Sequence, residues 1–118
     1  MQITDSRLPQ DTEATQFLVC YAQNDWLGFF GLSSALKKFY PAGLSETEKQ
    51  AIVVRLAGEL WDRNVRPGEP TNTNPITFVP WDMPKQAAVH RFQSELAALG
   101  HIPLLDTGEV CWFDLIET

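Results

Sequence analysis

The chain has 118 residues, of which 44% are hydrophobic and 20% charged, and it carries a formal net charge of −6 at pH 7. This composition is typical of one globular domain with a core of its own, and it excludes a disordered chain. No apolar run approaches the roughly 18 residues of a membrane span, so we expect no membrane association.

The N-terminal part of the chain predicts a flexible segment followed by a helix. Residues 1–10 are polar and non-periodic, whereas 11–118 read as a single globular α+β domain. The start "MQITDSRLPQ" lacks a basic region followed by an apolar core, so it is no signal peptide and we expect a cytoplasmic protein. A first helix is predicted from a cap at Asp11 or Thr12 through Gln23.

A second helix is predicted over "WLGFFGLSSALKKFY", residues 26–40. Asn24-Asp25 provides a break and a new cap before it, and Pro41 ends it. Gly28 and Gly31 are poor helix formers, and their spacing predicts that another element packs closely against that face.

The third predicted helix has the strongest local signals. Ser45 and Glu48 form a capping-box pattern, in which hydroxyl and carboxylate each accept a backbone N–H of the first turn. The helix should run from Glu46 to about Arg63, with Asn64 as a left-handed cap. Its wide apolar face predicts the central core helix.

The next stretch predicts a loop, a strand and a helix. "RPGEPTNTNP", residues 66–75, reads as a polar loop, and "ITFVP", residues 76–80, as a short strand between prolines. A fourth helix should begin at a cap on Asp82, tolerate Pro84 in its first turn and close at Gly100.

The end of the chain completes a small sheet. A final strand is predicted over 109–116, and we expect it to pair with 76–80. A third strand could come from residues 64–70. The fold class is therefore α+β, with four helices and a small antiparallel sheet of two or three strands.

Residue patterns for catalysis or metal binding are missing from the sequence. His90 and His101 stand in no metal-ligand spacing and read as surface or boundary residues. Cys20 and Cys111 lie among apolar residues and read as buried packing residues rather than reactive thiols. We therefore expect no enzyme, no cofactor and no bound metal.

Carboxylates gather near the C-terminus, and aromatic residues are frequent. Asp106, Glu109, Asp114 and Glu117 lie within the last 13 residues and predict a solvated acidic edge. A carboxylate pair in a cleft could perform acid–base catalysis, which is the enzymatic alternative. The four tryptophans mainly predict core filling, but Trp81 is the candidate for an exposed binding residue.

The segment "SETEKQAIVVRLAGELWDRNVRPGEP", residues 45–70, has the pattern of a DNA-reading helix and yet lacks its charge. Glu46 and Glu48 occupy the end that would enter the major groove, and acids outnumber bases over the segment. We therefore expect a scaffold helix and little nucleic-acid binding by a monomer. A dimer that brings Arg63 and Arg66 together is the alternative.

"NDWLGFFGLSSAL", "LAGELWDRNVRPGEP", "FVPW" and "GEVCWFDL" resemble small uncharacterised bacterial proteins with a D-W helix start, an F-x-x-W strand and a terminal W-F strand. Asn64 departs from their turn pattern, in which a glycine is expected. The resemblance covers residues 24–118 and implies a winged-helix-like scaffold in a bacterial cytosol. It carries no site residues, and an immunity-protein role is a class analogy only.

These observations favour a non-catalytic protein-binding module, such as an immunity protein that masks a basic toxin or nuclease domain. Its partner would be another protein, and a homodimer is compatible with the sequence. The binding residues would be Trp81, Asp106, Glu109, Asp114 and Glu117. The alternatives are a dimeric winged-helix DNA-binding regulator and a small enzyme with a carboxylate pair.

Overall fold

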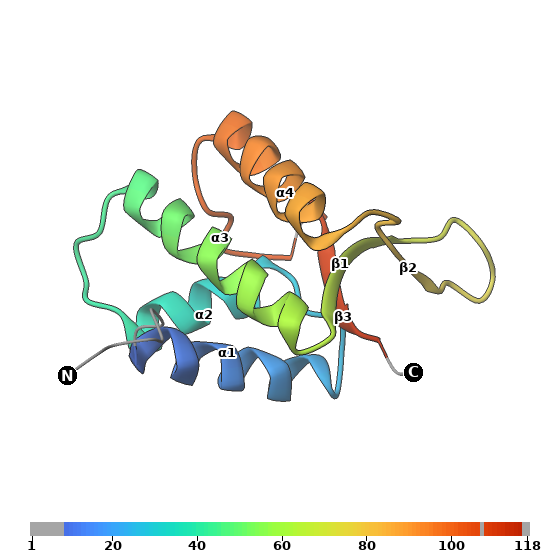
Figure 1. Cartoon of the computed structure of the whole chain (residues 1–118), viewed down its shortest axis with the longest axis horizontal. Coiled ribbons are helices and arrows are strands. Elements are labelled where there is room, and N and C mark those ends of the chain that lie inside the picture. The colour runs from blue at the N-terminus through green and yellow to red at the C-terminus, as the bar shows by residue number, and fades with distance from the viewer. Residues whose placement is uncertain (1–8, 107, 117–118) are drawn as a thin grey trace.

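The computed structural model describes residues 9–106 and 108–116 (Figure 1). Four helices and a three-stranded antiparallel sheet confirm the α+β class. In chain order the elements are α1 (Pro9–Ala22), α2 (Phe29–Phe39), α3 (Glu46–Asp62), β1 (Val65–Pro70), β2 (Phe78–Pro80), α4 (Lys85–Leu99) and β3 (Trp112–Leu115).

The sheet has the order β2-β1-β3, with both neighbours antiparallel to β1. The strand that residues 64–70 were expected to contribute is therefore present as β1. The expected pairing of 76–80 with 109–116 is wrong, because β1 lies between them. Residues 66–70, read as loop, belong to this central strand.

β1 contains two prolines and a glycine, which strands usually avoid, and it forms nevertheless. Pro67 has no N–H, but its carbonyl accepts a hydrogen bond from the Trp81 N–H at 2.9 Å. Gly68 lies so close to β2 that a Cβ there would stand 2.7 Å from the Phe78 ring and 2.7 Å from the Pro80 Cα. The strand therefore needs a residue without a side chain at this position.

The core joins the helices to the sheet through three buried phenyl rings. Phe29 of α2 stacks on Phe92 of α4 with ring centroids 6.2 Å apart, and Phe92 meets Phe113 of β3 edge-on at 5.5 Å. In Figure 1, α3 runs between α1 and α4, and it contacts both of them. The expected central position of this helix is confirmed.

The first helix begins earlier than expected. Pro9 and Gln10 belong to α1, so the prediction of a flexible segment is wrong for these two residues, and its remainder, residues 1–8, lies outside the described residues. Asp11 lies inside the helix instead of capping it. Its side chain is buried because it pairs with Arg55 of α3.

The second helix begins at Phe29, three residues later than expected. Leu27 instead exchanges two backbone hydrogen bonds with Phe113, at 2.7 and 2.8 Å, and extends the edge of β3. Asp25 therefore does not cap α2. Close packing at the glycines is confirmed, since a Cβ on Gly28 would stand 2.8 Å from the Trp112 ring.

The local signals of α3 are confirmed, and those of α4 only at its end. The capping box of Ser45 and Glu48 is present with both hydrogen bonds, and Asn64 is left-handed with φ 64°. The N-cap of α4 is Pro84 rather than Asp82, whereas Gly100 closes the helix with φ 82°.

Two further expectations concern membranes and thiols. Within residues 9–106 and 108–116, no helix is both long and apolar enough to cross a membrane. Both cysteines are free, and Cys111 is buried as expected. Cys20 is exposed, contrary to the expectation, because its side of α1 faces solvent.

Candidate binding groove

A groove with a volume of about 750 Å³ opens between α2, the α2–α3 loop, the start of α3 and the loop after α4. Its lining is mainly apolar and comes from chain segments far apart in sequence. The apolar lining residues are Leu36, Pro41, Ala42, Leu44, Ile102, Pro103, Leu104 and Leu105. The hollow is therefore suited to an apolar group.

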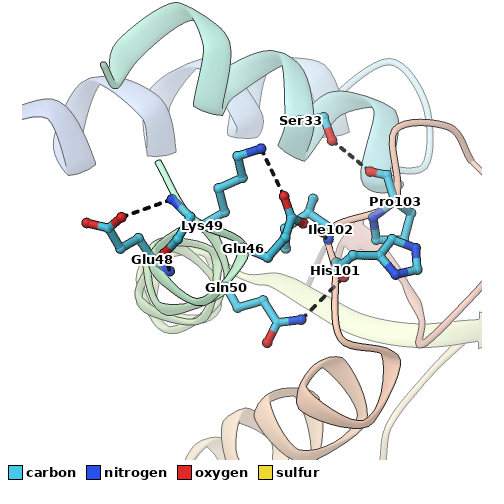
Figure 2. Close-up of polar contacts among 9 residues, drawn as sticks. Ser33, Glu46, Glu48, Lys49, Gln50, His101, Ile102 and Pro103 are labelled. Carbon is cyan, nitrogen blue, oxygen red and sulfur yellow. Dashed lines mark hydrogen bonds and ion pairs between the residues drawn. The ribbon is translucent and has the colours of Figure 1, made fainter. Parts of the chain in front are cut away.

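One wall of the groove is the strap, defined here as residues 101–106. Figure 2 shows how its middle is fixed: the Ser33 hydroxyl donates to the Pro103 carbonyl at 2.7 Å. The Ile102 N–H donates to Glu46 Oε1 at 2.9 Å. This hydrogen bond, followed by that from Lys49, lowers the pKa of the Glu46 carboxyl, so the contact is held by an ionised acid.

The two ends of the strap are also fixed to helices. At one end, the Gln50 amide donates to the carbonyls of His101, at 3.3 Å (Figure 2), and of Leu96, at 2.7 Å. At the other, the Phe30 N–H of the first turn of α2 donates to Asp106 Oδ1 at 2.9 Å. Asp106 thus satisfies a helix N-terminus that has no cap of its own.

The strap presents two adjacent leucines to solvent. Leu104 is 63% exposed and Leu105 64%, although both also line the groove. We call these two residues the leucine ridge. Ile102 and Pro103 of the same strap are buried, so the exposure of apolar side chains is confined to these two leucines.

Charged groups of both signs line the groove. Lys37, at the C-terminal end of α2, and Glu109 have no hydrogen-bonding or ionic side-chain partner among residues 9–106 and 108–116. Lys49 is paired with Glu46 at 3.1 Å. The His101 ring nitrogen lies 3.2 Å from the Leu99 carbonyl. Lys37 and Glu109 are thus the charges available to a bound partner.

A partly buried network of hydrogen bonds supports the groove wall at Tyr40. Its hydroxyl donates a short hydrogen bond to Asp11 Oδ1, and Arg55 binds the same carboxylate through Nε at 2.9 Å and Nη2 at 3.2 Å. Burial by itself raises the pKa of Asp11, but the bonds from Arg55 and Tyr40 outweigh it and leave the pKa lowered. The pKa of Tyr40 is raised by burial and by the Asp11 carboxylate.

The expectation of an exposed Trp81 is wrong. Its side chain is only 7% exposed, its indole N–H donates to Glu69 at 3.1 Å, and the Arg91 guanidinium stacks on its ring at 3.8 Å. The backbone N–H of Trp81 donates to the Pro67 carbonyl of β1, which holds the residue beside the sheet, and Arg91 belongs to α4. Trp81 is therefore a packing residue in this structure.

The three predicted acids that the structure describes do not form one edge. Asp106 ends the strap and Glu109 lines the groove. Asp114 lies in β3 opposite Arg66 of β1 and is half-buried. Glu117 lies outside the described residues. Of the three described acids, Glu109 lines the groove and Asp106 stands at the end of the strap.

The basic residues of the segment 45–70 are engaged within the chain, which bears on the DNA-binding alternative. Each has a partner close by: Lys49 has Glu46, Arg55 has Asp11, Arg63 has Gln16 at 3.1 Å and Arg66 has the Trp61 ring at 4.0 Å. The Glu46 carboxylate accepts the Ile102 N–H of the strap, and the Glu48 carboxylate accepts the Ser45 N–H at the start of α3. The two basic residues within α3, Lys49 and Arg55, are thus paired with carboxylates, whereas Arg63 and Arg66 contact neutral groups.

Metal binding has no support in the described part of the chain, residues 9–106 and 108–116, where no group of three or more His, Cys, Asp or Glu residues could hold an ion. His90 and His101 are both exposed there, as expected.

Comparison with protein-family models, curated proteins and solved structures finds no match to the chain. The groove is the candidate binding site of the described residues.

Proposed function

We propose that this chain is a non-catalytic module that binds another protein through the leucine ridge and the adjoining groove. The observation that carries the proposal is the exposure of Leu104 and Leu105 side by side at the edge of an apolar hollow. Large exposed apolar patches mark interaction sites, because they are otherwise a liability for a protein in water. A partner that covers the ridge would bury both leucines.

The charge of the chain supports a basic partner. The net charge is −6, and Asp106 and Glu109 stand beside the ridge and in the groove. Such acids speed the approach of a basic protein. An immunity protein of a bacterial cytosol, which masks a basic toxin or nuclease domain, would have these properties, on a winged-helix-like scaffold.

The two alternatives have less support. A dimeric DNA-binding regulator would need a basic face, but acids outnumber bases over residues 45–70, and Lys49 and Arg55 are paired with carboxylates. An enzyme with a carboxylate pair would need two free acids together. Among the predicted acids, Asp106 is held by the N-terminus of α2, and Asp114 lies on the sheet.

The test is an affinity capture from the native host with three immobilised proteins: the natural chain, the double variant Leu104→Ser/Leu105→Ser, and Ile76→Ser. Ile76 is 62% exposed and does not line the groove, so it is a matched apolar control. We expect a basic protein to be retained by the natural chain and by Ile76→Ser, and lost with the double variant.

Two results would contradict the proposal. Retention of the same protein by the double variant would place the interface elsewhere, and capture of nucleic acid alone would favour the DNA-binding alternative. Thermal unfolding of each variant must first match that of the natural chain. If the retained protein is the chain itself, measurement of the molar mass in solution would identify the interface as a homodimer.

A further inference from the structure

We propose that the groove also binds a small ligand with an apolar body and one anionic end, with Lys37 as the residue that binds the anion. The inference does not depend on the protein partner proposed above. It rests on the size of the hollow, on the state of the polar atoms in its walls and on the charges at its rim.

The size and lining of the groove fit a small apolar body. Small-ligand sites typically have volumes of about 300–1,000 Å³ and mainly apolar walls with a few polar groups. The groove has about 750 Å³, and its walls include Leu36, Leu44 and Ile102. An alkyl chain or a similar apolar body would replace water against these side chains.

The two hydroxyl groups in the groove walls are already bonded within the protein. The Ser33 hydroxyl donates to the Pro103 carbonyl, and the Tyr40 hydroxyl donates to Asp11. A hydrocarbon body needs no hydrogen-bond partner, so it can lie against the apolar walls without requiring these hydroxyl groups.

The charges at the rim favour an anion. The Lys37 ammonium has no partner among residues 9–106 and 108–116, whereas the neighbouring Lys38 lies over the Phe39 ring and does not line the groove. Of the two rim carboxylates, Glu46 already accepts hydrogen bonds from Ile102 and Lys49. Of these two carboxylates, Glu109 is therefore the one that would repel an anionic ligand.

The experiment compares three twelve-carbon probes by titration calorimetry below their micelle-forming concentrations: dodecanoate, dodecanol and dodecyltrimethylammonium. The proteins are the natural chain, Lys37→Gln, the neighbouring control Lys38→Gln, and Ala42→Trp, which fills the groove from its exposed lining loop. We expect dodecanoate to bind most tightly and with a ratio of one to one.

The variants separate charge from cavity. Lys37→Gln should weaken dodecanoate about tenfold, the value of one charge-assisted contact at a partly exposed site, and should leave dodecanol unchanged. Lys38→Gln should bind all three probes like the natural chain, and Ala42→Trp should lose them.

The proposal is overturned if the ammonium probe binds as tightly as dodecanoate, because Glu109 would then set the charge preference. Equal losses in Lys37→Gln and Lys38→Gln would show a general effect of net charge instead of a site. Binding that persists in Ala42→Trp would place the ligand outside the groove, and failure of all three probes to bind would remove the site altogether.

Discussion

At the scale of single residues, substitution of Ser45 tests the capping box directly. Its hydroxyl accepts the Glu48 N–H at 3.1 Å, and its own N–H donates to the Glu48 carboxylate at 2.9 Å. Ser45→Ala removes the first bond, so we expect the free energy of unfolding to fall by about 1 kcal/mol. Chemical denaturation measures this free energy, and Thr47→Ala, at an exposed position of the same first turn, is the control.

An unchanged denaturation midpoint in Ser45→Ala would show that the serine does not cap α3. Equal losses in Ser45→Ala and Thr47→Ala would mean that the effect is not specific to the Ser45 hydroxyl, since alanine by itself favours the helix. Because Glu46, which fixes the strap, belongs to the same first turn, loss of the cap should also weaken the groove wall.

The pH dependence of stability tests the Asp11 network. Asp11 is 4% exposed and its pKa is lower in the folded protein than in the unfolded chain, since Arg55 and Tyr40 outweigh the effect of burial. Protonation therefore favours unfolding. The stabilisation is complete above the ordinary carboxyl pKa of about 4 and is lost as the pH falls through the lowered value.

We expect Asp11→Asn to be less stable than the natural chain at neutral pH and to lose less stability on acidification below about pH 4. Denaturant unfolding at a series of pH values measures both. Asp82→Asn, which removes an exposed carboxylate, is the control and should keep the natural slope. An unaltered slope in Asp11→Asn would mean that this carboxylate does not contribute to acid denaturation.

Residue-scale features were predictable where the signal is local. Ser45 with Glu48, Asn64 and Gly100 act on backbone groups within a few positions, and all were placed correctly. The outcome for Trp81 was not predictable in this way, because its burial depends on Arg91, ten residues further on in another element.

At the scale of elements, Gly68 decides whether β1 can lie against β2. A Cβ at this position would stand 2.7 Å from both the Phe78 ring and the Pro80 Cα. We expect Gly68→Ala to lower the free energy of unfolding by about 2 kcal/mol or more, since the contact with backbone atoms cannot relax easily.

Gly58 is the matched control for Gly68. It lies inside α3, and a Cβ there would meet only the Lys85 Cε at 3.9 Å. Gly58→Ala should therefore raise the free energy of unfolding by about 1 kcal/mol, the gain in helix propensity. The two substitutions are chemically the same and are expected to act in opposite directions. A neutral Gly68→Ala would mean that β2 moves away from β1 at little cost.

The helices were easier to predict than the sheet. Apolar periodicity and caps located all four helices, with errors of a few residues at the starts of α1, α2 and α4. The central strand was read mainly as loop, because Pro67, Gly68 and Pro70 are residues that strands usually avoid. Strand order is a long-range property, and short strands leave too little pattern to specify it.

At the scale of the whole molecule, the groove could not be predicted because no local pattern describes it. It forms where the end of α2 and the start of α3, which a short loop joins, meet the strap, which follows in the chain only after β1, β2 and α4. The acids at 106 and 109 were identified as candidates from composition. Their separation from Asp114 depends on the path of the chain through the strap and β3.

Long-range charge and local contact should affect association with a basic partner in different ways. Glu109→Lys and the control Asp82→Lys each change the net charge from −6 to −4, but only Glu109 lines the groove. We expect both variants to slow association at low salt, with the larger effect for Glu109→Lys. The difference should vanish near 1 M salt, where the Debye length falls to about 3 Å.

The leucine ridge should instead control dissociation. Leu105→Ser removes apolar contact that salt does not screen, so we expect the captured partner to dissociate roughly tenfold faster at low and high salt alike. Surface plasmon resonance at the two salt concentrations separates the rates. If Leu105→Ser alters only association, the ridge is not the binding site. If Asp82→Lys slows association as much as Glu109→Lys, the partner is drawn by net charge and not by the acid in the groove.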